Sequence, residues 1–243
     1  MDLINAQKTS TTRSALILFV SVLSIFITNK TFAMSPVKNA PQETPSAPTT
    51  PPEVSDPEQE NQSGVDWRNY DHLDPDHVVP TTALQKAVAY FDANQSKIKN
   101  KNYMIVLDFS RHSGKKRFYI INMKTGAVES FKTAHGKYSD PDHDGYATSF
   151  SNTNGSGKSS IGFYLTAETY YGANGYSLKL DGLSSTNSNA RSRAVVIHPA
   201  NYVSENSSKQ GRSLGCPALD PKHSEKIIEK IKRGSLIYAF NKL

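Results

Sequence analysis

The sequence predicts a mainly β fold of the α+β class, with two helices packed on the strands. Short runs rich in β-branched and aromatic residues recur after residue 100. Two other segments carry apolar residues at the spacing of an amphipathic helix. Residues 64–243 number about 180, which suits one globular domain with a sizeable core.

The first helix is predicted directly after Pro80. The apolar residues that follow recur at helical spacing and form one face: Ala83, Leu84, Ala87, Val88 and Phe91. The pattern then changes to strands, with β-rich runs at residues 103–109, 117–123 and 127–134. Lys124, Thr125 and Gly126 separate the last two runs, so we expect a hairpin there.

Four further runs complete the predicted strands, at residues 160–166, 177–183, 193–197 and 235–240. The second helix lies between the last two. Asp220 is its expected N-cap, Pro221 takes the first helical position and Gly234 follows its end. One face of this helix carries Ile227, Ile228 and Ile231.

Residues 1–33 are predicted to be an export signal. Lys8 and Arg13 precede an apolar run at residues 15–27, and small residues come before Met34. The run is too short for a comfortable membrane span, so no stable span is expected after signal cleavage. We therefore expect an exported protein of the periplasm or cell envelope.

Residues 34–63 are predicted to be a disordered linker, because they hold seven of the thirteen prolines and almost no large apolar side chains. This linker carries a net charge of −4, whereas residues 64–243 carry +8. A basic domain suits a polyanionic envelope, with simple solubility as the alternative explanation. The sequence has no Arg-rich helix, aromatic and basic platform or zinc-knuckle spacing, so no nucleic-acid partner is expected.

Cys216 is the only cysteine, and it lies in a glycine-containing turn eighteen residues after His198. A thiol beside a base and free backbone N–H groups is suited to acyl transfer. A lone cysteine is more often a small buried hydrophobe, and a lone histidine is often structural. An exported chain with one cysteine cannot form an internal disulfide, which favours a functional thiol. The polar residues 199–212 would form a flap over such a site.

The other titratable clusters give weaker signals. Residues 140–145 open like a calcium loop, but Ser151 stands where the twelfth-position carboxylate is required, so an ordinary Asp/Gly turn is favoured. His135, before Gly136, ends a predicted strand; a structural role is favoured, with a place near the site as the alternative. The remaining histidines have no metal-ligand spacing: His72, His77, His112 and His223. No metal and no cofactor are predicted.

The order His198 before Cys216 differs from papain-like peptidases, in which the cysteine lies far upstream of its histidine. The chain resembles the L,D-transpeptidases of bacterial peptidoglycan, specifically the murein L,D-transpeptidase catalytic domain branch of the YkuD-like superfamily. Their signature is a histidine, fourteen to seventeen residues, Ser or Thr, usually His, and then Gly-Cys. Here fourteen residues separate His198 from Ser213, and Leu214, Gly215 and Cys216 follow. Further similar segments lie at residues 159–164, 178–183, 189–191 and 234–235, so the resemblance spans roughly residues 103–240.

The resemblance implies a β-sandwich-like catalytic domain that acts on peptidoglycan stem peptides. Cys216 would be the nucleophile and His198 its base, oriented by the carbonyl of Pro199. Ser213 and Gly215 would belong to the catalytic turn, whose backbone N–H groups stabilise an oxyanion. Ser213 would either bond the thiolate or shape the turn.

Substrate contacts are expected from the residues that flank the catalytic turn. Arg212 would hold a stem carboxylate, with simple solvation as the alternative. Leu214 departs from the family, which usually has a second histidine there. Pro217, Ala218 and Leu219 stand where the family often has a polar residue or Arg.

The implied reaction expels D-Ala from a tetrapeptide stem by attack on diaminopimelate, then passes the acyl group to an amine or to water. We expect a monomer. A sortase-like cysteine acyltransferase is an alternative, although sortases need an Arg soon after the cysteine and the next here is Arg233. A catalytically inactive envelope-binding module is the other alternative.

Overall fold

The structure, a computed structural model, describes residues 64–242. The predicted export signal and linker lie outside the described residues, and the domain boundaries drawn from the sequence stay predictions. Within residues 64–242, no helix is long and apolar enough to cross a membrane.

The strands form one eight-stranded mixed sheet and one two-stranded sheet within the described part of the chain. The large sheet has the order β3-β2-β1-β10-β5-β6-β7-β9, with parallel pairing of β1 with β10 and of β7 with β9. Its strands are β1 (Tyr103–Asp108), β2 (Phe118–Asn122), β3 (Val128–Phe131), β5 (Gly162–Gly172), β6 (Gly175–Gly182), β7 (Val196–Pro199), β9 (Ala218–Leu219) and β10 (Leu236–Phe240). The small sheet pairs β4 (His135–Gly136) with β8 (Arg212–Ser213) in parallel.

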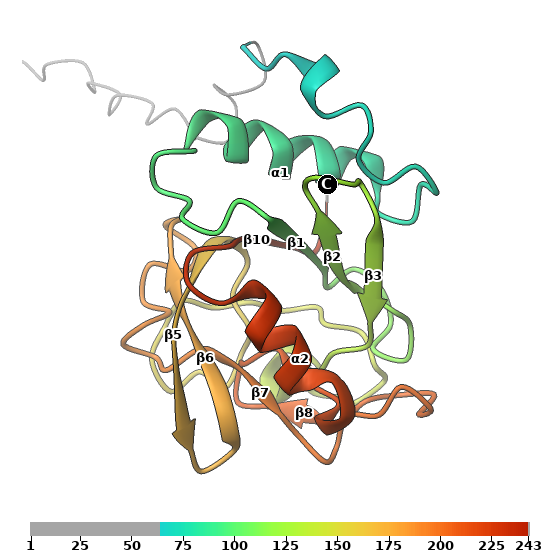
Figure 1. Ribbon diagram of the computed structural model, residues 1–243. Helices are drawn as coiled ribbons and strands as arrows, with labels where there is room; N and C mark the ends of the chain where they lie inside the picture. The colour runs from blue at the N-terminus through green and yellow to red at the C-terminus, as the bar shows by residue number, and fades with distance from the viewer. Residues whose placement is uncertain (1–63, 243) are drawn as a thin grey trace, which may run out of the picture. The chain divides into compact units, whose positions relative to one another are not determined.

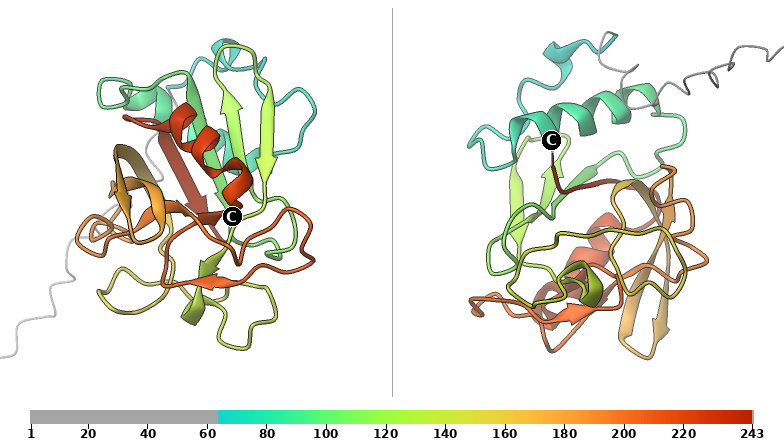
Figure 2. Two further views of the ribbon diagram at one scale, coloured as in Figure 1. Left: turned by 60° about the horizontal axis from the view of Figure 1, so that its bottom comes forward. Right: turned by 180° about the vertical axis from the view of Figure 1, so that it is seen from behind.

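The two helices pack on opposite faces of the central strands (Figures 1 and 2). α1 (Thr81–Ala93) buries its apolar face against one side of β1 and β10, the side that carries Met104 and Val106. α2 (Pro221–Ile231) buries its isoleucines against the other side, with Ile105 and Leu107. Successive side chains of a strand point to opposite faces, so β1 must be apolar on both, and residues 104–108 are all buried.

The core around α2 draws residues from both ends of the large sheet. Ile105 of β1 and Ile237 of β10 share this core with Leu178 of β6, Ile197 of β7 and Leu219 of β9. The sheet therefore twists around α2 so that distant strands bury one common core. The predicted mainly β, sandwich-like fold with two packed helices is confirmed.

The ends of the helices follow the sequence signals. The Asp220 carboxylate accepts a hydrogen bond from Lys222 N at 2.9 Å, and Pro221 occupies the first helical position. Gly234 follows α2 with a φ of +102°, a conformation that favours glycine. Two short 3-10 helices, η1 (Trp67–Asn69) and η2 (Lys137–Ser139), complete the described elements.

Candidate active site

The parallel pairing of β7 with β9 brings His198 and Cys216 to one end of the sheet. His198 lies on β7, where it is in register with Ala218 of β9. Cys216 stands two residues before Ala218, in the tight turn that joins β8 to β9. Eighteen residues apart in the sequence, the two residues thus lie on β7 and on the turn that leads into its neighbour β9.

His198 is buried, and its ring orientation is fixed by the next residue. Its Nδ1 lies 2.9 Å from the Pro199 carbonyl oxygen, which can only accept, so Nδ1 carries the proton and Nε2 is the basic nitrogen. Burial lowers the pKa of His198, and the bond to Pro199 offsets this only in part. The imidazole is therefore neutral near pH 7, the form that accepts a proton.

The half-buried Cys216 thiol contacts the backbone that leads into β7. Its Sγ lies 3.5 Å from Val196 N, which donates to it, and 3.6 Å from the carbonyl oxygen of Ala194. Among the described residues the thiol makes no hydrogen bond to His198. Burial raises the pKa of Cys216, while the Val196 N–H and the charge of Arg193 lower it in part. The resting site therefore pairs a neutral thiol with a neutral imidazole.

Ser213 shapes the catalytic turn through its hydroxyl. Ser213 Oγ accepts a hydrogen bond from Gly215 N at 3.0 Å and donates one to the Cys216 carbonyl at 2.6 Å. This geometry fits the turn-shaping role rather than a bond to the thiolate. The Gly215 N–H is therefore occupied and is not available to a further acceptor.

Gly215 is required by its conformation and by its surroundings. Its φ is +127°, and a Cβ built there would lie 2.7 Å from the carbonyl oxygen of Lys158. Ser159 Oγ donates to the Gly215 carbonyl at 3.0 Å, so residues 158 and 159 lie directly against the turn. The sequence pattern indicated the segment that contains Ser159 but not this contact.

The two predicted substrate-contact residues flank the same turn but have different surroundings. The Arg212 guanidinium donates to the carbonyl oxygens of Lys137 and Pro141 at 3.4 and 3.2 Å, and also to that of Asp140. Its charge therefore holds the loop after β4. Leu214 is 77% exposed, so its side chain is open to a ligand.

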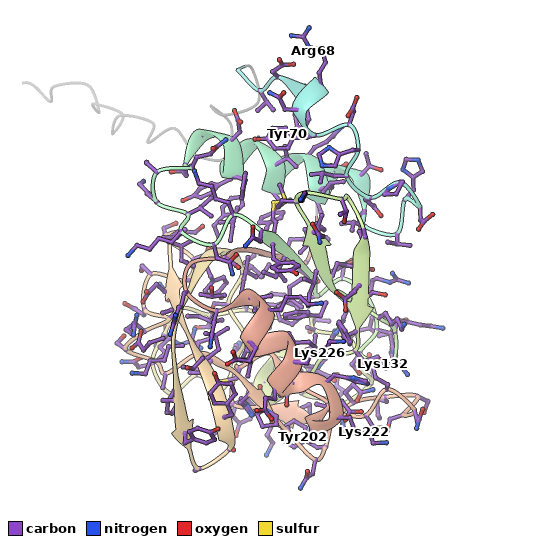
Figure 3. All side chains as sticks on the ribbon, viewed as in Figure 1. Arg68, Tyr70, Lys132, Tyr202, Lys222 and Lys226 are labelled. Carbon is purple, nitrogen blue, oxygen red and sulfur yellow. The ribbon has the colours of Figure 1, made fainter. Side chains whose placement is uncertain are left out.

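The polar loop at residues 199–212, predicted as a flap, is held by hydrogen bonds at several points. Gly211 N donates to the Tyr202 carbonyl at 2.8 Å, and Glu205 links Lys132 N to the Asp220 carboxylate at the start of α2. In Figure 3 this loop and the labelled Tyr202 lie at the same end of the sheet as the start of α2. Burial raises the pKa of Tyr202 to about 12, and the nearby Cys216 contributes. Tyr202 is thus a further side chain near the thiol that sequence analysis missed.

His135 belongs to a second buried cluster beside the site. Its Nδ1 lies 2.8 Å from Arg117 Nη2 and its Nε2 lies 3.0 Å from the Asp140 carboxylate. Burial lowers the pKa of His135 to about 4, and the positive charge of Arg117 contributes. Both ring nitrogens are occupied, which agrees with the structural role expected for this residue.

The loop at residues 140–145 is a turn in which the first residue, Asp140, accepts hydrogen bonds from later residues. The Asp140 carboxylate accepts from Asp144 N and Gly145 N, at 3.0 and 3.1 Å, besides its contact to His135. Burial alone would raise the pKa of Asp140, but these hydrogen bonds lower it overall. Within residues 64–242 no group of three or more His, Cys, Asp or Glu side chains is placed to hold a metal ion.

Comparison with known proteins identifies the class. Residues 76–240 match the family of L,D-transpeptidase catalytic domains, so the chain belongs to this family. The match includes both β7, which carries His198, and the turn that contains Cys216. No curated protein matches the chain.

Among solved structures, similar proteins are L,D-transpeptidases of low sequence identity. One from Mycobacterium tuberculosis H37Rv is 13% identical, with a TM-score of 0.39, and the alignment covers 57% of this chain and 57% of that one. One from Mycobacterium smegmatis is 12% identical, with a TM-score of 0.36 and coverage of 57% and 58%. The chain thus spans less than two thirds of the length of these relatives, and the family assignment is based on the sequence match alone.

Proposed function

We propose that this protein is a peptidoglycan L,D-transpeptidase in which Cys216 is the nucleophile and His198 the general base. The observation that carries the proposal is the register of β7 with β9, which sets an oriented neutral imidazole beside the thiol turn. The family match supports the same substrate class. The acyl donor is a tetrapeptide stem with diaminopimelate at its third position.

The reaction begins with transfer of the thiol proton to Nε2 of His198. In the resting site the thiol contacts the carbonyl of Ala194, so the transfer exchanges that contact for one to the imidazole. The thiolate attacks the diaminopimelate carbonyl, and the N–H groups of Leu214 and Cys216 stabilise the oxyanion. Collapse of this intermediate expels D-Ala, which takes the proton from His198, and leaves an acyl-enzyme.

The acyl group then passes to one of two acceptors. The side-chain amine of another stem gives a direct diaminopimelate crosslink, and water gives a trimmed tripeptide. Exposed Leu214 and Tyr202 flank the thiol and would meet the incoming acceptor. Arg212 lies close enough to the turn to contribute to stem recognition.

The cellular setting belongs to the same proposal. We place the enzyme in the periplasm or cell envelope, as a monomer whose basic domain associates with the polyanionic wall. A catalytically inactive envelope-binding module is the second candidate, favoured by one observation, the absence of a hydrogen bond between Cys216 and His198 among the described residues. A sortase-like enzyme is disfavoured because the next arginine, Arg233, follows α2.

Mass spectrometry of the full chain incubated with a diaminopimelate tetrapeptide muropeptide tests the proposal. We expect loss of D-Ala, as a tripeptide or as a dimer lacking one D-Ala. Cys216→Ala should abolish both products while leaving the fold intact. His77→Ala, which alters an exposed histidine, is the matched control and should retain activity.

An unchanged substrate with the wild-type chain would contradict the proposal. It would favour the inactive module, especially if Cys216→Ala kept its affinity for isolated wall.

A further inference from the structure

Arg193 lies in the turn before β7, and its guanidinium binds one neighbouring segment at four points. Nη1 donates to the Ser151 carbonyl at 2.5 Å and to Ser160 Oγ at 3.2 Å. Nη2 donates to Ser156 Oγ at 3.1 Å and to the Lys158 carbonyl at 2.6 Å. These four bonds use the N–H groups of both terminal nitrogens, so the guanidinium is committed to the protein and has little capacity left for a substrate.

The Lys158 carbonyl connects this guanidinium to the catalytic turn. It accepts from Arg193 on one side, and on the other it lies 2.7 Å from the position that a Cβ of Gly215 would take. Arg193 Nη2 itself lies 3.5 Å from that position. The adjacent Ser159 hydroxyl bonds the Gly215 carbonyl. The segment that Arg193 holds therefore packs directly against the Cys216 turn.

The charge of Arg193 also lies close to the thiol turn, because its Nη2 is 3.5 Å from the Cβ position of Gly215, the residue before Cys216. Among the described residues no carboxylate forms an ion pair with it, since its partners are carbonyls and hydroxyls. A half-buried cation without a neutralising partner exerts its field on nearby groups. Arg193 lowers the pKa of Cys216 and partly offsets the rise that burial causes.

We propose that Arg193 is a positioning residue that holds the Cys216 turn in place and favours the thiolate. The inference deepens the proposed function and rests on it for the effect on turnover. Its effect on the thiol is independent of any substrate. The two parts are therefore measured separately.

The test compares Arg193→Met, Arg193→Lys and the control Arg191→Met in the full chain. The Arg191 side chain makes exposed ion pairs with Asp181 and Glu168 and does not bond the segment that Arg193 holds. For each variant, the rate of iodoacetamide alkylation is measured against pH, and D-Ala release from the muropeptide is measured alongside.

Arg193→Met should move the alkylation curve to higher pH by about one unit, which is about tenfold in rate near neutral pH. It should also slow D-Ala release about 100-fold, because the turn is no longer held. Arg193→Lys keeps the charge but not the planar fork, so alkylation should change less than threefold while release slows about tenfold. Arg191→Met should match the wild type in both.

A folded Arg193→Met variant with wild-type alkylation and release would overturn the inference. If that variant does not fold, Arg193→Lys decides, and wild-type D-Ala release in it would overturn the positioning role. If the wild-type chain releases no D-Ala, the proposed function fails. The effect of Arg193 on the thiol is tested separately by alkylation, and an unshifted alkylation curve in Arg193→Met would refute it.

Discussion

Two buried histidines lie close to the thiol turn, and their surroundings give them opposite properties. His198 is 3% exposed and His135 is 1% exposed, so burial alone does not distinguish them. His198 bonds one neutral carbonyl through Nδ1, which leaves Nε2 as an available base. His135 lies between Arg117 and Asp140 and has both nitrogens occupied. A buried histidine can act as a base only where its surroundings leave one ring nitrogen free.

The largest expected effect is the loss of turnover on replacing the available base. His198→Gln should lower D-Ala release about 1000-fold, because it removes the proposed general base. His135→Gln should keep release within about tenfold of the wild type, since that ring transfers no proton. Muropeptide turnover of both variants, measured by mass spectrometry, checks this. Similar losses in both variants would show that the two histidines do not differ in the way described.

The next effect concerns the stability that the buried cluster around His135 gives to the fold. Arg117 is fully buried and donates to the carbonyls of Thr133 and Arg111 as well as to His135. Arg117→Met leaves these buried acceptors without their donor, so the free energy of unfolding should fall by about 3 kcal/mol. Urea denaturation of the wild type and the variant measures this change in the free energy of unfolding. A fall below about 1 kcal/mol would mean that the cluster is not a structural support.

The third effect is the pH dependence of stability. The folded-state pKa of His135, about 4, lies below the ordinary histidine value of 6.5. The unfolded chain therefore binds a proton as the pH falls below 6.5, and the folded chain does not until about pH 4. The free energy of unfolding should decrease across this window as the pH falls.

His135→Gln removes this titration from both states and should flatten the decrease. His77→Gln, at an exposed position, is the control and should keep the wild-type slope. Denaturation midpoints between pH 7 and pH 4 give the comparison. An unchanged slope in His135→Gln would assign the acid sensitivity to other groups, the carboxylate of Asp140 first among them.

Features that depend on neighbouring residues in the chain were predictable from the sequence. The apolar face of α1, the N-cap Asp220 of α2 and the hairpin at Gly126 each depend on neighbouring residues, and each is present. The two-residue strands β4, β8 and β9 were missed, because a run of two residues has no period to detect. The run at residues 160–166 extends as β5 to Gly172, since its partner β6 continues the pairing.

The sequence by itself determined the class of the protein. The spacing of His198 and Cys216, the glycine before the thiol and the contact from Pro199 all lie within one short stretch, so local patterns were sufficient. The tertiary structure alone decided what surrounds that stretch. Arg193 reaches carbonyls and hydroxyls 33 to 42 residues away, and Arg212 reaches a loop more than 70 residues away. A guanidinium can pair with many acceptors, so its partner depends on which distant backbone the fold brings within hydrogen-bonding distance.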